Sequence, residues 1–413
     1  MLLLAAATLP TVGFSGIAEV AVLAVIVPLT LHLVRRLPLP SAVLEIVAGI
    51  ILGPSVLGWI QVDLPIYVLS LLGLSVLLFL GGLEIDIAAL RGPIARMVGG
   101  SFVASMALAL LLGMGLQGVG VVRDGALIGI ILASTSLGIV LPLIKDAGYE
   151  HTTYGRLALA AASVGEFVPV LLLSVFFSSA TPAVGSHLVM LGLFTAFCLV
   201  VFATLGQARR MHRIGPFARE LQDTSAQIGI RAMFALLALL GAVALRLGFS
   251  GILGTFVAGA IVRQVDRDAT ILNERERTKL NAIGYGIFVP FFWITTGLQF
   301  DLDALLDTPV AILRVPIFLG GLLLVRGLPA LLYARLVGTR QAVSLGLLQA
   351  TSLSFIVVAA QLGQTLGLIV SATSAALITA ALISALVFPV LALAVAPVPI
   401  PAEAGQPAQA EAG

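Results

Sequence analysis

The stretch ASTSLGIVLPL (residues 133–143) interrupts an apolar segment with small hydroxyl side chains, followed by Gly138 and Pro142. A second apolar segment is interrupted in a similar way by QATSLSFIVVA (residues 349–359). Such residues favour a break in a membrane helix when the freed backbone groups find other partners. Ser and Thr can also bond back to the preceding turn of an unbroken helix, which leaves each segment open on its own. The matched pair favours two broken helices.

The composition indicates a chain embedded in a membrane along almost its whole length. Of 413 residues, 60% are hydrophobic and 10% are charged, and the mean hydropathy is +1.14. A soluble chain of this length could not bury so much apolar surface. Thirteen apolar segments lack the period-two alternation of barrel strands and predict transmembrane helices. They span about residues 17–34, 41–60, 64–83, 97–117, 125–144, 156–178, 185–206, 225–247, 249–264, 280–299, 309–334, 341–363 and 367–395.

The two interrupted segments occupy matching places in the chain. Each is the fifth member of a six-helix unit, the first over about residues 17–178 and the second over about 225–395, linked by the segment 185–206. Because seven crossings separate equivalent helices, the two units have inverted topology. Broken helices at matching positions of inverted repeats indicate the substrate site of a transporter. We therefore expect an all-α transmembrane domain over residues 1–395.

Basic residues predict how the helices are oriented. They gather after odd-numbered segments, as at Arg35, Lys145 and the RRMHR sequence (209–213), whereas the opposite ends hold few. Basic loops remain in the cytoplasm. This pattern predicts a multi-pass protein of the inner (plasma) membrane, with its N-terminus outside and its C-terminus in the cytoplasm. Residues 396–413 are rich in Pro, Ala and Glu and predict a disordered cytoplasmic tail.

Two opposite charges are predicted near the middle of the membrane. Glu166 lies ten residues beyond Arg156, or about 15 Å at helical rise. Arg326 lies nine residues before Arg335, or about 14 Å from the same face. The hydrocarbon core is about 30 Å thick, so both charges lie near its centre. An intramembrane carboxylate indicates a functional site, and a permanent salt bridge between Glu166 and Arg326 is the structural alternative.

Glu166 is the predicted site at which a proton and a small monovalent cation exclude each other. Burial disfavours an ionised carboxylate and a nearby guanidinium favours it. Arg326 keeps its charge and cannot carry a second proton. One proton would then exchange for one cation, with no net charge moved. Ser134, Thr135 and Ser136, with backbone carbonyls of both broken helices, are expected to complete the binding shell, and Arg326 is expected to hold the carboxylate when the site is unoccupied.

Six motifs, in order, resemble the monovalent cation:proton antiporter family, which includes bacterial sodium/proton exchangers and the membrane domains of potassium-efflux systems. The resemblance covers the chain to about residue 390. The motifs are LEIVAGIILGPSVLG (44–58), LLFLGGLEIDIAALR (77–91), ASTSLGIVLPLIKDAG (133–148), YGRLALAAASVGEF (154–167), FVPFFWITTGLQFDL (288–302) and LLLVRGLPALL (322–332).

The resemblance implies a homodimer of thirteen-helix subunits, with a mobile core domain, a dimerisation domain and elevator-like alternating access. Family members place the cation-binding carboxylate on the sixth helix, where it matches Glu166, and a basic residue on the eleventh, where it matches Arg326. Their crossed, partly unwound helices match the breaks expected at Gly138, Thr351, Ser352 and Ser354.

Two positions depart from the family pattern. Many members carry two polar or acidic residues at the sixth-helix site, whereas Gly165 precedes Glu166 here. Members also often have an acidic residue on the twelfth helix where this chain has Ser354. The missing first acid agrees with electroneutral exchange of one proton for one cation.

Three classes of function stay open at this point. The leading hypothesis is a secondary antiporter of H⁺ against Na⁺ or K⁺, in contact with the lipid bilayer and without cofactor, transition metal or nucleic acid. The alternatives are a cation channel without obligatory proton coupling and a transport-inactive membrane sensor. Enzyme chemistry is not expected, because the sequence contains no evident nucleophile–base pair or metal-ligand cluster. Glu45, near the start of its segment, is as compatible with interfacial anchoring as with transport.

Overall fold

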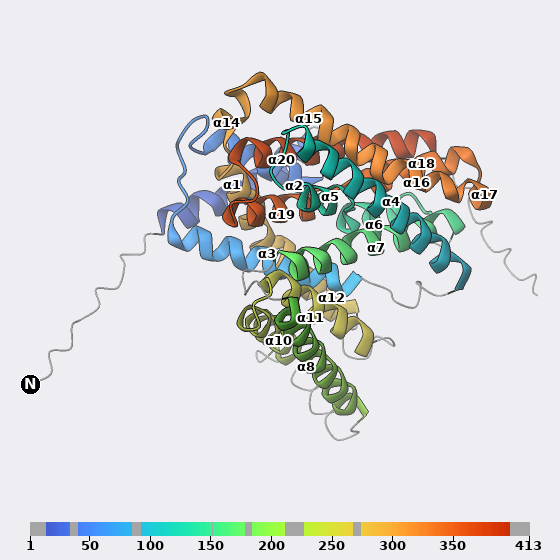
Figure 1. Cartoon of the computed structure of the whole chain (residues 1–413). Helices are drawn as coiled ribbons and strands as arrows, with labels where there is room; N and C mark the ends of the chain where they lie inside the picture. Colours follow the sequence, from blue (N-terminus) through green and yellow to red (C-terminus); the bar gives the residue numbers. More distant parts are fainter. Residues whose placement is uncertain are drawn as a thin grey trace, which may run out of the picture.

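The computed structural model describes residues 14–33, 40–84, 92–150, 152–177, 184–210, 227–266 and 274–396. The regular structure of these ranges is helical, which confirms the all-α prediction (Figure 1). Within them, ten helices are long and apolar enough to cross a membrane, and three shorter apolar helices accompany them. The count of thirteen crossings and the inverted repeats stay predictions. The predicted tail lies outside the described residues from position 397 onward.

The first half of the chain forms α1 (Ser15–Leu33), α2 (Ser41–Leu52), α3 (Leu64–Glu84), α4 (Gly92–Gly118), α5 (Gly125–Leu132), α6 (Leu137–Asp146) and α7 (Thr153–Phe176). Helix α8 (Val184–Arg210) covers the predicted link. The second half begins with α10 (Ile228–Arg246), α11 (Gly251–Val265), α12 (Glu274–Ile283), α13 (Val289–Leu298), α14 (Leu302–Leu306) and α15 (Pro309–Leu322). It ends with α16 (Leu328–Ala330), α17 (Ala334–Val337), α18 (Thr339–Ala350), α19 (Ser354–Thr365) and α20 (Ser371–Val395).

Two apolar segments are broken in the middle. Residues 133–136 separate α5 from α6, and residues 351–353 separate α18 from α19. Ser136 and Thr351 both have extended backbone dihedrals, with ψ of 102° and 110°. The structure therefore places Thr351 and Ser352 inside a break. Two other predicted break positions are helical, since Gly138 lies in the first turn of α6 and Ser354 begins α19.

Two further segments widen locally into a π-helix. The turn η1 (Gly284–Phe288) joins α12 to α13, and η2 (Leu323–Gly327) joins α15 to α16. Each turn is followed closely by a proline, Pro290 or Pro329, which has no N–H to donate to the carbonyl four residues earlier. The wider turn accommodates the lost bond. The turn η2 contains Arg326.

Small residues let α2 and α13 approach each other closely. A Cβ atom added at Gly49 would lie 2.2 Å from the carbonyl oxygen of Ile294. One added at Gly297 would lie 2.1 Å from the carbonyl oxygen of Ile46. Any larger side chain at either position would therefore separate the two backbones, as at close helix crossings in other membrane proteins.

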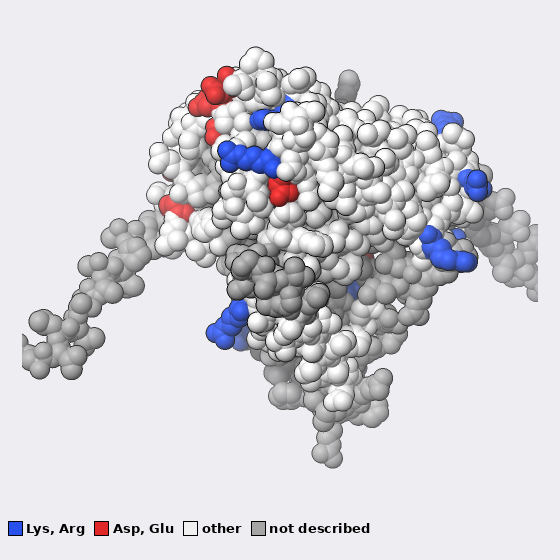
Figure 2. Space-filling model, in the orientation of Figure 1, with Lys and Arg blue, Asp and Glu red and all other residues white. Residues whose placement is uncertain are grey.

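The broken helices are the most enclosed part of the fold, and α8 is the most exposed. In the most apolar stretch of the α18–α19 segment, 89% of the residues are buried. In the corresponding stretch of α8, 6% are buried. Helices α8, α10 and α11 extend from one side of the molecule, drawn in green and olive in Figure 1. Uncharged residues cover most of the face drawn in Figure 2, with Lys, Arg, Asp and Glu in a few small groups. Such a surface suits contact with lipid.

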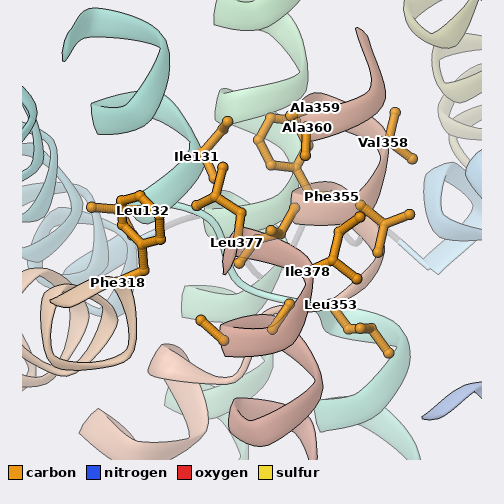
Figure 3. Close-up of a cluster of buried hydrophobic side chains, with 14 of the residues drawn as sticks. Ile131, Leu132, Phe318, Leu353, Phe355, Val358, Ala359, Ala360, Leu377 and Ile378 are labelled. Carbon is orange, nitrogen blue, oxygen red and sulfur yellow. The ribbon is translucent and has the colours of Figure 1, made fainter. Parts of the chain in front are cut away.

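A cluster of apolar side chains holds the breaks in place (Figure 3). Ile131 and Leu132 at the end of α5 pack in one buried cluster with Phe355 of α19 and Leu377 of α20. Phe318 of α15 belongs to the same cluster. Packing thus fixes the helix ends on both sides of each break. The free backbone groups at these helix ends therefore have defined positions.

Candidate ion-binding site

The two breaks meet each other and α7 through backbone hydrogen bonds. The amide of Ser136 donates to the carbonyl oxygen of Thr351 over 2.9 Å. The amide of Thr135 donates to the carbonyl oxygen of Gly165, on α7, over 3.0 Å. Buried amides require such partners, because water is scarce at this depth. These bonds define a crossing at which four helix ends converge.

The three hydroxyl residues predicted on the first break all bond to the second broken helix. The Oγ atoms of Ser134 and Ser352 lie 2.7 Å apart, and those of Ser136 and Ser354 lie 3.1 Å apart. The hydroxyl of Thr135 donates to the carbonyl oxygen of Gln349 over 2.5 Å. Paired side chains of this kind fix the register of the crossing. Each oxygen still has acceptor capacity for a further partner.

Glu166 lies against the N-terminus of α6. Its side chain is 7% exposed, and its Oε2 atom accepts a hydrogen bond from the amide of Leu137, the first residue of that helix, over 2.9 Å. A helix N-terminus carries partial positive charge and stabilises an anion. Among the described residues, Oε1 has no hydrogen-bond partner. Gly81 of α3 faces it, and a Cβ at that position would lie 3.7 Å from Oε1. One carboxylate oxygen is therefore free to bind a ligand.

Arg326 lies on the other side of the crossing and is 1% exposed. Its Nε donates to the hydroxyl of Thr135 over 3.0 Å and to the carbonyl oxygen of Gln349 over 3.5 Å. One Nη atom donates to the carbonyl oxygen of Ala161 over 3.4 Å. The guanidinium also lies 5.4 Å from the centre of the Phe102 ring, within range of a cation–π contact.

Neither an ion pair nor a hydrogen bond joins the described side chains of Arg326 and Glu166 in this conformation, and a contact between them in the unoccupied state stays a prediction. Each charge instead meets a helix end of opposite sign. The carboxylate lies at the N-terminus of α6, and the guanidinium lies at the C-terminus of α18, where it contacts the carbonyl of Gln349. Helix ends carry about half an elementary charge, so they can take the place of a direct partner. The structural alternative, a permanent salt bridge between Glu166 and Arg326, is therefore excluded.

The packing around Gly165 explains why this chain has no side chain at the first acidic position of the family pattern. A Cβ atom at Gly165 would lie 2.6 Å from Nη2 of Arg326 and 2.8 Å from Oγ1 of Thr135. The guanidinium therefore occupies the space that a side chain would need. The sequence departure follows from the placement of Arg326 beside α7.

Sequence reasoning missed Ser384 of α20, which supports the second break. Its hydroxyl lies 3.0 Å from the carbonyl oxygen of Ser352 and accepts from the amide of the same residue at 3.3 Å. Ser384 is one of two hydroxyl residues, with Thr379, in the mostly apolar stretch LITAALISALVF (377–388), and a hydroxyl there was an available signal. The contacts of Gln349 and Ala161 had no such signal, because both use backbone carbonyls, which every residue has.

Two cavities lie near opposite ends of α19. The first, of about 420 Å³, is lined by Gly138 and Ser354 at the crossing and by Glu45 of α2 and Asp146 of α6. The second, of about 340 Å³, is lined mainly by polar side chains, namely Thr296, Gln299, Gln361, Gln364, Thr365 and Ser374. The crossing thus has a hollow on each side along the direction of α19. Within the described residues, no group of three or more His, Cys, Asp or Glu side chains could hold a metal ion.

Comparisons with known proteins identify the family of the chain. The family described as sodium/hydrogen exchanger, transmembrane, matches residues 21–393. The Na⁺/H⁺ antiporter of Enterococcus hirae is 29% identical over 279 residues, which cover 65% of this chain and 69% of that protein. The Na⁺/H⁺-K⁺ antiporter GerN of Bacillus cereus is also 29% identical over 279 residues, covering 65% of this chain and 68% of GerN. YjbQ of Bacillus subtilis (strain 168) is 28% identical over 391 residues, which cover 91% of this chain. The chain spans 62% of the length of YjbQ.

A solved structure shares the fold. The sodium proton antiporter MjNhaP1 from Methanocaldococcus jannaschii at pH 8 gives a TM-score of 0.61 at 17% sequence identity, over 92% of this chain and 96% of that one. Together with the family match, which covers most of the chain, this confirms a multi-pass membrane protein and the resemblance drawn from the six motifs. The chain belongs to the sodium/hydrogen exchanger family.

Proposed function

We propose that the protein is a secondary active antiporter that exchanges a monovalent cation, Na⁺ or K⁺, for H⁺ at Glu166. The observation that carries the proposal is the carboxylate itself, buried beside two broken helices. One of its oxygens is bonded to a helix N-terminus, and the other has no partner among the described residues. The named activities of the Enterococcus hirae antiporter and of GerN support the ion classes, since GerN is a Na⁺/H⁺-K⁺ antiporter.

Competition for one oxygen couples the two ions in this proposal. When Oε1 carries a proton, the carboxyl group is neutral and its attraction for a cation is lost. When the proton leaves, the amide of Leu137 and the N-terminus of α6 stabilise the negative charge, and a cation can bind. Oxygen atoms of Ser134, Thr135 and Ser136, the backbone carbonyls of the breaks and water would complete the coordination shell. The position of these atoms at the crossing supports this assignment.

Exchange is electroneutral in this proposal, with one proton for one cation. Glu166 is the carboxylate that bonds to the broken helices, and Arg326 keeps its charge throughout the cycle. The site then carries the same net charge whether it holds a proton or a cation. Gly165 leaves no place for a second carboxylate, because the guanidinium fills that space.

Alternating access in a homodimer completes the proposal. The two cavities near the ends of α19 would serve as the approaches from the cytoplasm and from outside. The core would contain the broken helices, α7 and the π-turn η2 (residues 323–327), and the exposed face of α8 would belong to the dimerisation side. The predicted topology, with the N-terminus outside, supports the cytoplasmic assignment of the cavity that holds Asp146.

The test uses purified protein in liposomes with an acidic lumen and a trapped pH dye, to which Na⁺, K⁺ or Li⁺ is added outside. We expect cation-driven alkalinisation that Glu166→Gln abolishes and that clamping the membrane potential leaves unchanged. Tracer cation flux without proton flux would favour a channel instead. A folded protein without response to any of these cations from acidic to alkaline pH would favour the sensor.

A further inference from the structure

We infer that Glu45 forms a second cation-binding site. A hydrated monovalent cation would bind there, in the cavity, before it reaches the crossing of the broken helices. The inference deepens the proposed function and rests on it for the identity of the ion. It concerns a carboxylate that the exchange step at Glu166 does not use. Its basis is the juxtaposition of a buried acid without a partner among the described residues and a cavity that leads to the broken helices.

Glu45 is a buried acid without a protein partner in the part of the chain that the structure describes. Its side chain is 4% exposed. Across the described residues it takes part in neither a hydrogen bond nor an ion pair. An ionised carboxylate in such a place is costly unless a counter-charge is bound or a proton neutralises it. A cation in the cavity would supply that counter-charge.

The cavity is acidic and contains room for water. Glu45 and Asp146 are the charged side chains among its described lining residues, and neither lysine nor arginine contributes. A volume of about 420 Å³ holds several water molecules, so a cation can bind there with part of its hydration shell. Ser41 and Tyr285 add hydroxyl groups, and the face of Trp293 can attract a cation.

The position of Glu45 in the cavity places this second binding site before the exchange site at Glu166. The same cavity reaches Ser354, whose hydroxyl pairs with that of Ser136 at the crossing. The amide of the next residue, Leu137, holds Glu166. Glu45 lies one helical turn before Gly49, where α2 packs closely on α13, so its backbone is fixed by that contact. An ion at Glu45 would therefore be near the crossing without touching Glu166.

The experiment measures equilibrium binding of radioactive Na⁺ and Rb⁺ to the full-length purified protein. The variants are Glu45→Gln, Glu166→Gln, the double variant and Asp63→Asn, a matched control whose carboxylate caps α3 away from the cavity. We expect Glu166→Gln to retain binding that the double variant loses. In liposomes we expect Glu45→Gln to raise the cation KM about tenfold with kcat nearly unchanged, Glu45→Asp to restore KM, and the control to match the unmodified protein.

Equal binding by Glu166→Gln and by the double variant would overturn the inference, and so would an unchanged KM in a Glu45→Gln protein that unfolds at the normal temperature. Failure of the proposed function gives a different result. In that case the unmodified protein would carry no coupled proton flux, whereas loss of cation binding on Glu45→Gln would still support the site.

Discussion

At the scale of the residue, Gly165 links the sequence departure to the geometry of the site. An alanine there adds a Cβ atom that would lie 2.6 Å from the guanidinium of Arg326. Overpacking of this kind typically costs about 1–3 kcal/mol. We expect Gly165→Ala to lower the unfolding temperature of the purified protein. Gly138→Ala is the matched control, because a Cβ at Gly138 meets no atom within 4 Å. Equal unfolding temperatures for the two variants would contradict this account of Gly165.

Thr135 supports the guanidinium of Arg326 through hydrogen bonds. Its hydroxyl accepts from the guanidinium and donates to the carbonyl of Gln349. Thr135→Val keeps the shape and removes both bonds, which leaves a buried charge short of an acceptor and costs about 1–3 kcal/mol. We expect a lower unfolding temperature and slower exchange in liposomes, with Thr135→Ser close to the unmodified protein. A Thr135→Val protein as stable as Thr135→Ser would show that the hydroxyl does not support the guanidinium.

The sequence predicts the depth of single residues in the membrane better than it predicts their contacts. The depth of Glu166 and Arg326 follows from helical rise and from the basic residues that mark the membrane surface. Their partners do not follow, because the acid meets the amide of Leu137 and the base meets the carbonyls of Ala161 and Gln349. Backbone groups carry no sequence signature, so attraction between opposite charges could not reveal these partners.

At the scale of the element, the hydroxyl clusters predict that two helices break, and the partners across the molecule decide where. Residues 133–136 leave the helix because the amides of Thr135 and Ser136 find carbonyls on α7 and at Thr351. Gly138 stays helical, although glycine favours a break, because Glu166 already caps α6 one residue before it. A carboxylate from another helix thus sets the start of α6, which local propensity cannot reveal.

Ser384 makes the second break testable. Ser384→Ala removes the hydroxyl that accepts from the amide of Ser352 and lies within donating distance of two carbonyl oxygens, that of Ser352 at 3.0 Å and that of Ala381 in α20 at 2.8 Å. The buried groups then lose a partner, at a cost of about 1–3 kcal/mol, and we expect slower exchange and a lower unfolding temperature. Thr379→Ala, on the same helix, is the control, since the hydroxyl of Thr379 bonds only within α20, to Ala375. If both variants behave alike, Ser384 does not hold the break.

At the scale of the whole molecule, the exposed α8 and the enclosed α18–α19 segment divide the fold into a part that meets its surroundings and a part that holds the site. Composition predicts that the chain enters a membrane, and basic residues predict its orientation. Neither predicts the cavities, because these arise from the packing of helices distant in sequence, such as α2 and α20 around the first cavity.

The two cavities give a test of topology and access together. In a protein with Cys198 replaced by alanine, Ser41→Cys places a thiol at the first cavity and Thr365→Cys at the second. A membrane-impermeant thiol reagent should label Ser41→Cys only from the cytoplasmic side and Thr365→Cys only from outside. The reason is that the predicted orientation puts residue 41 after an outside-to-inside crossing and residue 365 after an inside-to-outside one.

Labelling from the reverse sides would invert the predicted orientation and leave the geometry of the crossing intact. Labelling of both thiols from the same side would be more serious, because cavities on one side cannot serve alternating access through a single site. Addition of Na⁺ during labelling separates a static arrangement from a moving one. If the two cavities open in alternation, saturating cation should change the labelling rates of the two thiols in opposite directions, whereas a static protein would keep both rates constant.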